Sequence, residues 1–139
     1  MTTPTTAATT AAGTAKTIRR GYDAFARGDI PAALEVFHPE IAWHVPGRSP
    51  LSGDYRGHTG VLEFFGRCRE LSAGTLQVVP EEILAEGQRV IALCTVSAQR
   101  GDRSWSSPEV HLWRVRDGQA VEFCEFQGDQ QTEDEFWTS

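Results

Sequence analysis

The sequence contains no asparagine, and its three cysteines, Cys68, Cys94 and Cys124, stand far apart with no paired motif among them. An odd number of isolated cysteines excludes a complete disulfide framework and predicts small buried thiols in a reducing compartment. Without asparagine there is no site for N-linked glycosylation. Residues 1–15 carry no Lys or Arg and no Leu, Ile, Val or Phe. We therefore expect no secretory signal there and a cytoplasmic location.

Long apolar runs and positive charge are also scarce. No run approaches the roughly 20 apolar residues that a membrane-spanning helix needs. The chain has 13 Lys and Arg against 19 Asp and Glu, a net charge of −6. Because phosphate contacts need clustered cations, we expect neither nucleic acid nor a membrane as a partner. The sequence has no glycine-rich phosphate loop and no metal-ligand spacing of His and acidic residues, so we expect no cofactor and no metal.

What is present is typical of one globular domain: 139 residues, 40% hydrophobic and 23% charged. Residues 1–16 are almost only Thr and Ala and predict a disordered tail before a domain that spans residues 17–139. Ile18, Tyr22 and Phe25 recur at helical spacing and predict a first helix.

A second, shorter helix is predicted between Asp29, a typical N-cap with a proline in the first turn, and Pro39. A strand over residues 41–45 follows. Residues 46–53 are dense in Pro, Gly and Ser and predict a loop, and residues 59–71 predict a third helix.

The remainder predicts sheet. Residues 75–84, 89–99, 104–116 and 120–127 are rich in β-branched and aromatic residues, and short turn signals between them indicate antiparallel hairpins. A last helical turn is predicted at residues 133–137. Helices first and a strand meander second predict an α+β fold, with helices on one face of a curved sheet and a hollow between the two layers.

Five segments resemble the SnoaL-like branch of the ketosteroid-isomerase-like, or nuclear-transport-factor-2-like, superfamily. They are residues 22–30, 37–47, 49–53, 55–57 and 125–130. The likeness covers nearly all of the chain outside the tail. It implies a cone-shaped α+β barrel, in which three N-terminal helices pack on a strongly curved mixed or antiparallel sheet. It also implies a homodimer formed through the outer face of the sheet.

The family houses isomerases, polyketide cyclases, epoxide hydrolases, dehydratases and non-catalytic binding modules, so the fold alone does not select a function. Ketosteroid isomerases place an Asp base where this chain has Val45, and their oxyanion-hole carboxylic acid falls near His111. SnoaL-like cyclases use an acidic residue on the last strand, for which Glu125 is the nearest candidate. The Asp-Arg-Asp set of the epoxide hydrolases has no convincing counterpart in this chain.

The register implied by the family places His111 and Glu125 on the cavity side of neighbouring strands. Strand alternation puts Glu109 on the same face as His111. An imidazole beside a carboxyl group in an apolar pocket suits general acid–base catalysis, although a structural polar pair has the same pattern. Asp129, just after the last strand, is a third catalytic candidate, as a base at the cavity mouth or as a cap of the terminal segment.

Eight side chains are candidates for contact with a hydrophobic small-molecule substrate, and several of them equally suit an ordinary core. They are Tyr22, Trp43, Val45, Tyr55, Trp105, Trp113, Phe123 and Gln127. We predict a cofactor-independent enzyme, similar to polyketide cyclases or isomerases, that uses acid–base catalysis in this pocket. A non-catalytic small-molecule binding or assembly module is the first alternative, which the missing base at Val45 favours. An epoxide hydrolase of the same fold is the second.

Overall fold

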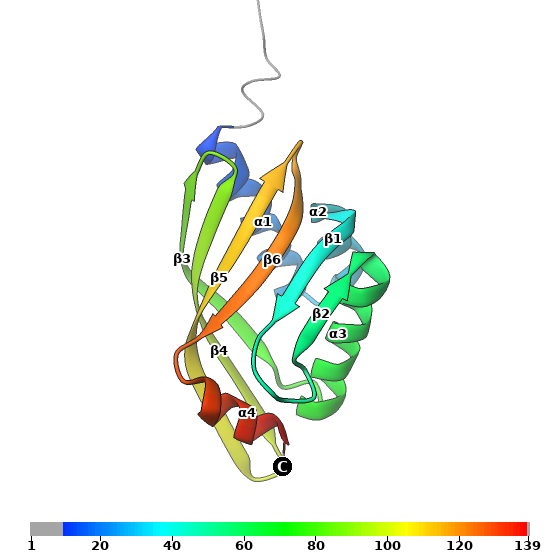
Figure 1. The fold of residues 1–139 in the computed structure, drawn as a ribbon, viewed down its shortest axis with the longest axis vertical. Helices are drawn as coiled ribbons and strands as arrows, with labels where there is room; N and C mark the ends of the chain where they lie inside the picture. Colours follow the sequence, from blue (N-terminus) through cyan, green and yellow to red (C-terminus); the bar gives the residue numbers. More distant parts are fainter. Residues whose placement is uncertain (1–9, 139) are drawn as a thin grey trace, which may run out of the picture.

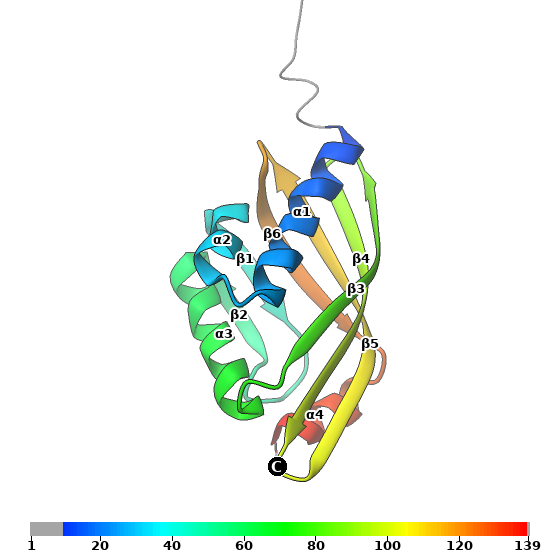
Figure 2. The ribbon, with the colours of Figure 1, turned by 180° about the vertical axis from the view of Figure 1, so that it is seen from behind.

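The computed structural model describes residues 10–138, which form four helices and one six-stranded sheet. The helices are α1 (Ala11–Ala26), α2 (Ile30–Val36), α3 (Gly57–Ser72) and α4 (Gln130–Thr138). The strands are β1 (Phe37–Val45), β2 (Gly53–Arg56), β3 (Gln77–Glu86), β4 (Arg89–Arg100), β5 (Arg103–Arg116) and β6 (Gln119–Gln127). Helices α1, α2 and α3 lie against one face of the sheet, and α4 lies at one end of it (Figures 1 and 2).

The strand order is β2-β1-β6-β5-β4-β3. All neighbours pair in antiparallel fashion except β1 and β6, which are parallel. The sheet is curled but not closed, because β2 and β3 remain as its two edges. This arrangement confirms the predicted α+β fold with helices packed on a curved mixed sheet.

Helix α1 begins earlier than the sequence predicted. Residues 11–16, which we had assigned to a disordered tail, form its first turns. The hydroxyl of Thr10 accepts a hydrogen bond from the backbone N–H of Gly13 and so caps the helix. Alanine has the highest helix propensity of all residues, and this tract needed only a cap. Residues 1–9 of the predicted tail lie outside the described residues.

The second helix follows its predicted signals. The carboxylate of Asp29 accepts from the N–H of Ala32, and a proline occupies the first turn. The helix ends at Val36, and β1 starts directly at Phe37, so Pro39 lies within a strand rather than after a helix.

Strand β2 was not predicted, since the predicted loop ended at residue 53 and the next predicted helix began at residue 59. It pairs with β1, with Tyr55 opposite Trp43. Only Tyr55 among its four residues is buried, so no alternating pattern marked it in the sequence. Gly57 follows at once with φ +70°, and a Cβ there would lie 2.8 Å from the carbonyl oxygen of Pro39. Glycine therefore allows α3 to begin this close to β1.

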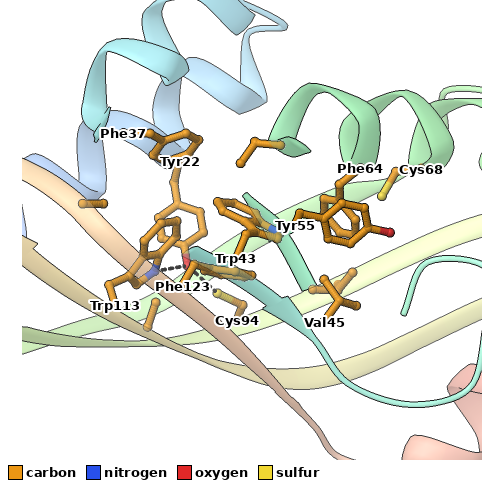
Figure 3. Packing of buried hydrophobic residues seen from close by; sticks show 14 of the residues in the cluster. Tyr22, Phe37, Trp43, Val45, Tyr55, Phe64, Cys68, Cys94, Trp113 and Phe123 are labelled. Atoms are coloured by element: carbon orange, nitrogen blue, oxygen red, sulfur yellow. Dashed lines mark hydrogen bonds between the residues drawn. The ribbon is translucent and has the colours of Figure 1, made fainter. Parts of the chain in front are cut away.

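The core lies between the three helices and the concave face of the sheet. Alternate residues of β4 and β5 point into it, as the period of two requires. Its centre is aromatic: the ring of Trp43 stacks on Phe123 with centroids 3.9 Å apart, and Trp113 lies 4.6 Å from the same Phe123 ring (Figure 3). None of the four described helices combines the length and apolar character that crossing a membrane requires.

Candidate active site

A cavity of about 80 Å³ lies between the helices and the concave face of the sheet. Its wall is mainly apolar and aromatic. Six of the eight predicted substrate-contact residues line it: Tyr22, Trp43, Val45, Trp105, Trp113 and Phe123. The volume is smaller than the roughly 150 Å³ of an engineered apolar cavity that binds benzene. In this conformation the cavity accommodates a small molecule or one part of a larger one.

His111 lies at the centre of the polar part of the cavity wall. Its side chain is buried, and its Nε2 is 2.8 Å from Oε1 of Glu109, which is also buried. In the register of the sheet His111 stands directly opposite Glu125 of β6, and both lie on the cavity side, as the family resemblance implied. All three residues line the cavity, so strand alternation placed an imidazole and two carboxyl groups on one concave surface.

The other ring nitrogen of His111 meets Tyr22 of α1. The Tyr22 hydroxyl is 2.6 Å from Nδ1 of His111, and it accepts a hydrogen bond of 3.0 Å from Nε1 of Trp113. A hydroxyl both donates and accepts, so it satisfies Nδ1 whether or not that nitrogen carries a proton. Glu109 accepts from Nε2–H in both cases. His111 can therefore change protonation state without losing a hydrogen bond.

The surroundings of His111 favour its charged form. Burial by itself lowers its pKa, but hydrogen bonds with Cys94 and Glu109 and the charges of Glu109 and Glu125 raise the pKa from 6.5 to about 10. Desolvation explains the lowering, and nearby negative charge explains the net rise. At neutral pH the site therefore holds an imidazolium beside the Glu109 carboxylate.

The environment of Glu125 favours its neutral form. Burial raises the pKa of Glu125 well above its usual range, the charge of Glu109 raises it further, and His111 acts in the opposite direction. Within the described part of the chain, no Lys or Arg lines the cavity. With one imidazolium near two carboxyl groups, the second carboxyl keeps its proton.

Glu133 of α4 adds a third buried carboxyl group to the cavity wall. Burial, followed by the charge of Glu109, raises its pKa from 4.5 to about 8. Its two oxygens accept hydrogen bonds from Nε1 of Trp137 and Nε2 of Gln130. Glu133 was not among the predicted site residues, because it stands within an acidic run that resembles an ordinary solvent-exposed end.

Three predicted site residues lie away from the cavity. Asp129 is exposed, and its carboxylate accepts from the N–H of Thr132, so it caps α4 instead of facing the cavity mouth. The hydroxyl of Tyr55 donates to the carbonyl of Leu51 and does not reach the cavity. Gln127 pairs with Glu109 in the sheet but is not part of the cavity wall.

Glu109 is the functional candidate that sequence reasoning undervalued. Its alternation with His111 was visible, but only the structure shows that its carboxylate bonds the imidazole directly. Cys94 was likewise considered only as a core residue, although its sulfur lies 3.6 Å from Nδ1 of His111. Strand alternation could place the Cys94 side chain on the inner face of β4. It could not show that Cys94 lies beside His111, because that depends on the register between β4 and β5.

The polar cluster also has the composition of a metal site. Glu109, His111 and Glu125 each offer one ligand atom, and these atoms lie within 4.8 Å of one another. His and carboxylate oxygens suit several divalent ions. Ligation by Nε2 of His111 would replace its hydrogen bond to Glu109, and ligation by Nδ1 would replace its hydrogen bond to Tyr22.

Comparison with known proteins places this geometry in a family. Residues 18–123 match the family model described as a SnoaL-like domain. An uncharacterized protein of Mycobacterium tuberculosis is 33% identical over 122 residues, which cover 86% of this chain and 92% of that protein.

Solved structures with the same fold include Bal32a, from a soil-derived mobile gene cassette, and TerC co-crystallized with polyporic acid. Bal32a is 33% identical with a TM-score of 0.87, and the match covers 91% of this chain and 98% of Bal32a. TerC is 27% identical with a TM-score of 0.81, over the same shares of the two chains.

Proposed function

Because this chain belongs to the SnoaL-like domain family, we propose that it is a cofactor-independent enzyme, similar to polyketide cyclases or isomerases, that transfers protons on a small hydrophobic, oxygenated molecule. One observation carries the proposal. His111 is bonded through both ring nitrogens to buried partners and stands opposite Glu125, and these groups face an otherwise apolar cavity.

In this proposal Glu125 is the acid and the His111–Glu109 pair is the base. The neutral Glu125 carboxyl donates its proton to a carbonyl oxygen of the substrate. The Glu109 carboxylate, held in place by His111, takes a proton from the adjacent carbon, and the product is an enol. The positive charge of His111 stabilises negative charge that develops on the oxygen. Return of the two protons at other positions gives isomerisation, and attack by the enol carbon on a second carbonyl gives cyclisation.

The cavity wall supports a hydrophobic substrate. Its aromatic side chains hold a planar or folded carbon skeleton next to the acid–base groups, which lowers the entropic barrier to reaction. TerC, a relative at 27% identity, was co-crystallized with polyporic acid, which also supports a small organic molecule as ligand. Because the cavity is only about 80 Å³, smaller than one that binds benzene, even a one-ring substrate requires the helices to move outward.

Deuterium exchange tests the proton transfer without knowledge of the natural substrate. We choose 1,4-cyclohexanedione, a one-ring diketone with acidic protons next to each carbonyl, and follow its exchange in D₂O by proton NMR. We expect the protein to accelerate the exchange, and the Glu125→Gln and Glu109→Gln variants to lose at least tenfold of that acceleration.

Glu122→Gln is the matched control, because Glu122 is exposed on the opposite face of the same strand. It should exchange the diketone at the wild-type rate. Equal rates in the wild type, Glu125→Gln and Glu109→Gln would contradict the proposal.

A non-catalytic binding module is the alternative that one observation favours. Val45 lines the cavity at the position where ketosteroid isomerases carry their base. Native mass spectrometry of the purified protein distinguishes the two functions. A tightly retained ligand that leaves the cavity chemically unchanged supports binding, whereas its conversion supports catalysis.

We also propose that two copies associate through the outer face of the sheet, as the resemblance implies. Leu84, Ile91, Val110 and Phe126 are large apolar residues exposed on that sheet, and Val110 and Phe126 stand opposite each other on β5 and β6. Sedimentation should give a dimer for the wild type and a monomer for Phe126→Lys. Leu62→Lys, a similarly exposed apolar residue on α3, should remain dimeric.

The three free cysteines support a reducing compartment, and we propose the cytoplasm.

A further inference from the structure

One buried donor of the cavity wall has no partner. Trp43 is 5% exposed and lines the cavity, yet its indole Nε1 has no hydrogen-bond acceptor among the described residues. A buried N–H that is left unpaired is penalised, because it has lost its hydrogen bond to water. A ligand that brings an acceptor to this N–H would remove the penalty.

Two other tryptophans of the wall have an acceptor for this group. The indole N–H of Trp113 donates to the Tyr22 hydroxyl at 3.0 Å, and that of Trp137 donates to Glu133 at 3.2 Å. Trp113 thereby belongs to the hydrogen-bond network around His111. Trp43 has no hydrogen bond to that network, although its ring contacts those of Trp113 and Phe123. The rings of Phe37, Phe64 and Phe65 also pack against it.

The distance from Trp43 to the acid–base groups suits one ring. The Phe123 ring lies 3.9 Å from that of Trp43 and 5.0 Å from that of His111, so the Trp43 and His111 rings are at most 8.9 Å apart, the sum of the two distances. A six-membered ring with oxygens at opposite ends spans a separation of this order. The wall between the two sites is apolar, so the middle of the ligand needs no polar group.

We propose that Trp43 is a specificity-determining residue whose indole N–H binds a second oxygen of the substrate. The substrate is then a molecule with two oxygens about one ring apart. One oxygen accepts from Trp43, and the other lies at Glu125 and His111, where the proton transfer takes place. This inference rests on the proposed function for the reacting end of the molecule, and on the unpaired N–H for the opposite end.

Two ligands of equal shape test it. In 4-methylenecyclohexanone one carbonyl oxygen of 1,4-cyclohexanedione is replaced by a CH₂ group, which cannot accept a hydrogen bond. We expect the wild type to bind the dione about three- to tenfold more tightly, the usual worth of one hydrogen bond. In Trp43→Phe this preference should disappear. In Tyr55→Phe, which removes a hydroxyl of a residue outside the cavity wall, the preference should remain.

A second measurement follows ligand binding to the wild-type protein alone. It therefore tests the inference even if Trp43→Phe folds poorly. In a ¹H–¹⁵N spectrum the dione should move the indole N–H resonance of Trp43 downfield, and the methylene analogue should not. Equal affinities for the two ligands together with an unmoved Trp43 resonance would overturn the inference. That result would indicate that the N–H points at a neighbouring aromatic ring, such as Phe65, which stands perpendicular to it.

The two proposals fail separately. If the Trp43 resonance and the ligand preference behave as expected but deuterium exchange is not accelerated, Trp43 binds the oxygen and the proton transfer is wrong. If exchange is accelerated in both ligands and their affinities are equal, the proton transfer stands and the assignment of Trp43 is wrong.

Discussion

His111 and Glu109 stand two residues apart on β5, and their side chains meet on the concave face with 2.8 Å between Nε2 and Oε1. Strand geometry produces this contact, since residues i and i+2 point to the same side. Both groups are buried, so the interaction is little screened by solvent. The pair therefore controls which form of His111 is present at neutral pH.

Replacing Glu109 by Gln should lower the pKa of His111. The substitution removes a negative charge and an ionic hydrogen bond, which are among the causes that raise that pKa to about 10. We expect the pKa to fall by at least one unit, toward the usual 6.5. A pH titration of the histidine ring protons by NMR measures it. The exposed His44 is an internal control, and an unchanged His111 titration would contradict the assigned geometry.

Tyr22→Phe should destabilise the fold. The variant leaves the indole N–H of Trp113 without its acceptor and removes the partner of Nδ1 of His111. Leaving a buried polar group unpaired costs about 1–3 kcal/mol. Urea denaturation measures the change. Tyr55→Phe, whose hydroxyl bonds Leu51 away from the cavity, should leave the His111 ring resonances unshifted, whereas Tyr22→Phe should shift them.

The free energy of unfolding should fall as pH rises above 4.5, in part through Glu133. Its folded pKa of about 8 exceeds the 4.5 of the unfolded chain, so the folded state binds this proton more tightly. The resulting stabilisation is complete below pH 4.5 and is lost as pH rises through 8. At about 1.4 kcal/mol per pKa unit, the loss is no more than about 5 kcal/mol.

The stabilisation that comes from protonated His111 also decreases as pH rises, but over a higher pH range. Its contribution is complete below pH 6.5 and is lost as pH rises through about 10. Denaturation at several pH values should therefore show a shallower decline between pH 4.5 and 8 for Glu133→Gln than for the wild type. The exposed Glu135→Gln on the same helix should keep the wild-type decline, and equal slopes in all three proteins would show that Glu133 ionises normally.

Asp129→Ala separates a cap from a catalytic base. Because Asp129 accepts from the backbone of Thr132 at the start of α4, its loss should lower the thermal midpoint slightly. Its carboxylate is exposed and outside the cavity wall, so the rate of diketone exchange should not change. A large loss of exchange activity would contradict this prediction and indicate that Asp129 takes part in catalysis.

Local patterns explain which parts of the fold were predictable. Asp29 marked the start of α2, and alternation along β5 placed Glu109 and His111 on one face, because caps and strand periods act between near neighbours in sequence. The placement of His111 and Glu125 on one side came from the family resemblance, because a register shift between Arg114 and Val115 changes the pairing that the short turn alone would give. The high helix propensity of alanine could also have predicted that α1 begins as early as Ala11.

Local spacing and short turns in the sequence predicted the α+β class, the curved meander and the common face of Glu109 and His111. Long-range packing instead makes β1 parallel to β6, buries Glu133 while Asp129 stays exposed, and leaves the N–H of Trp43 without an acceptor. These features arise from contacts between segments far apart in the chain. Burial and hydrogen-bond partners depend on what packs against a residue, and no local pattern encodes that.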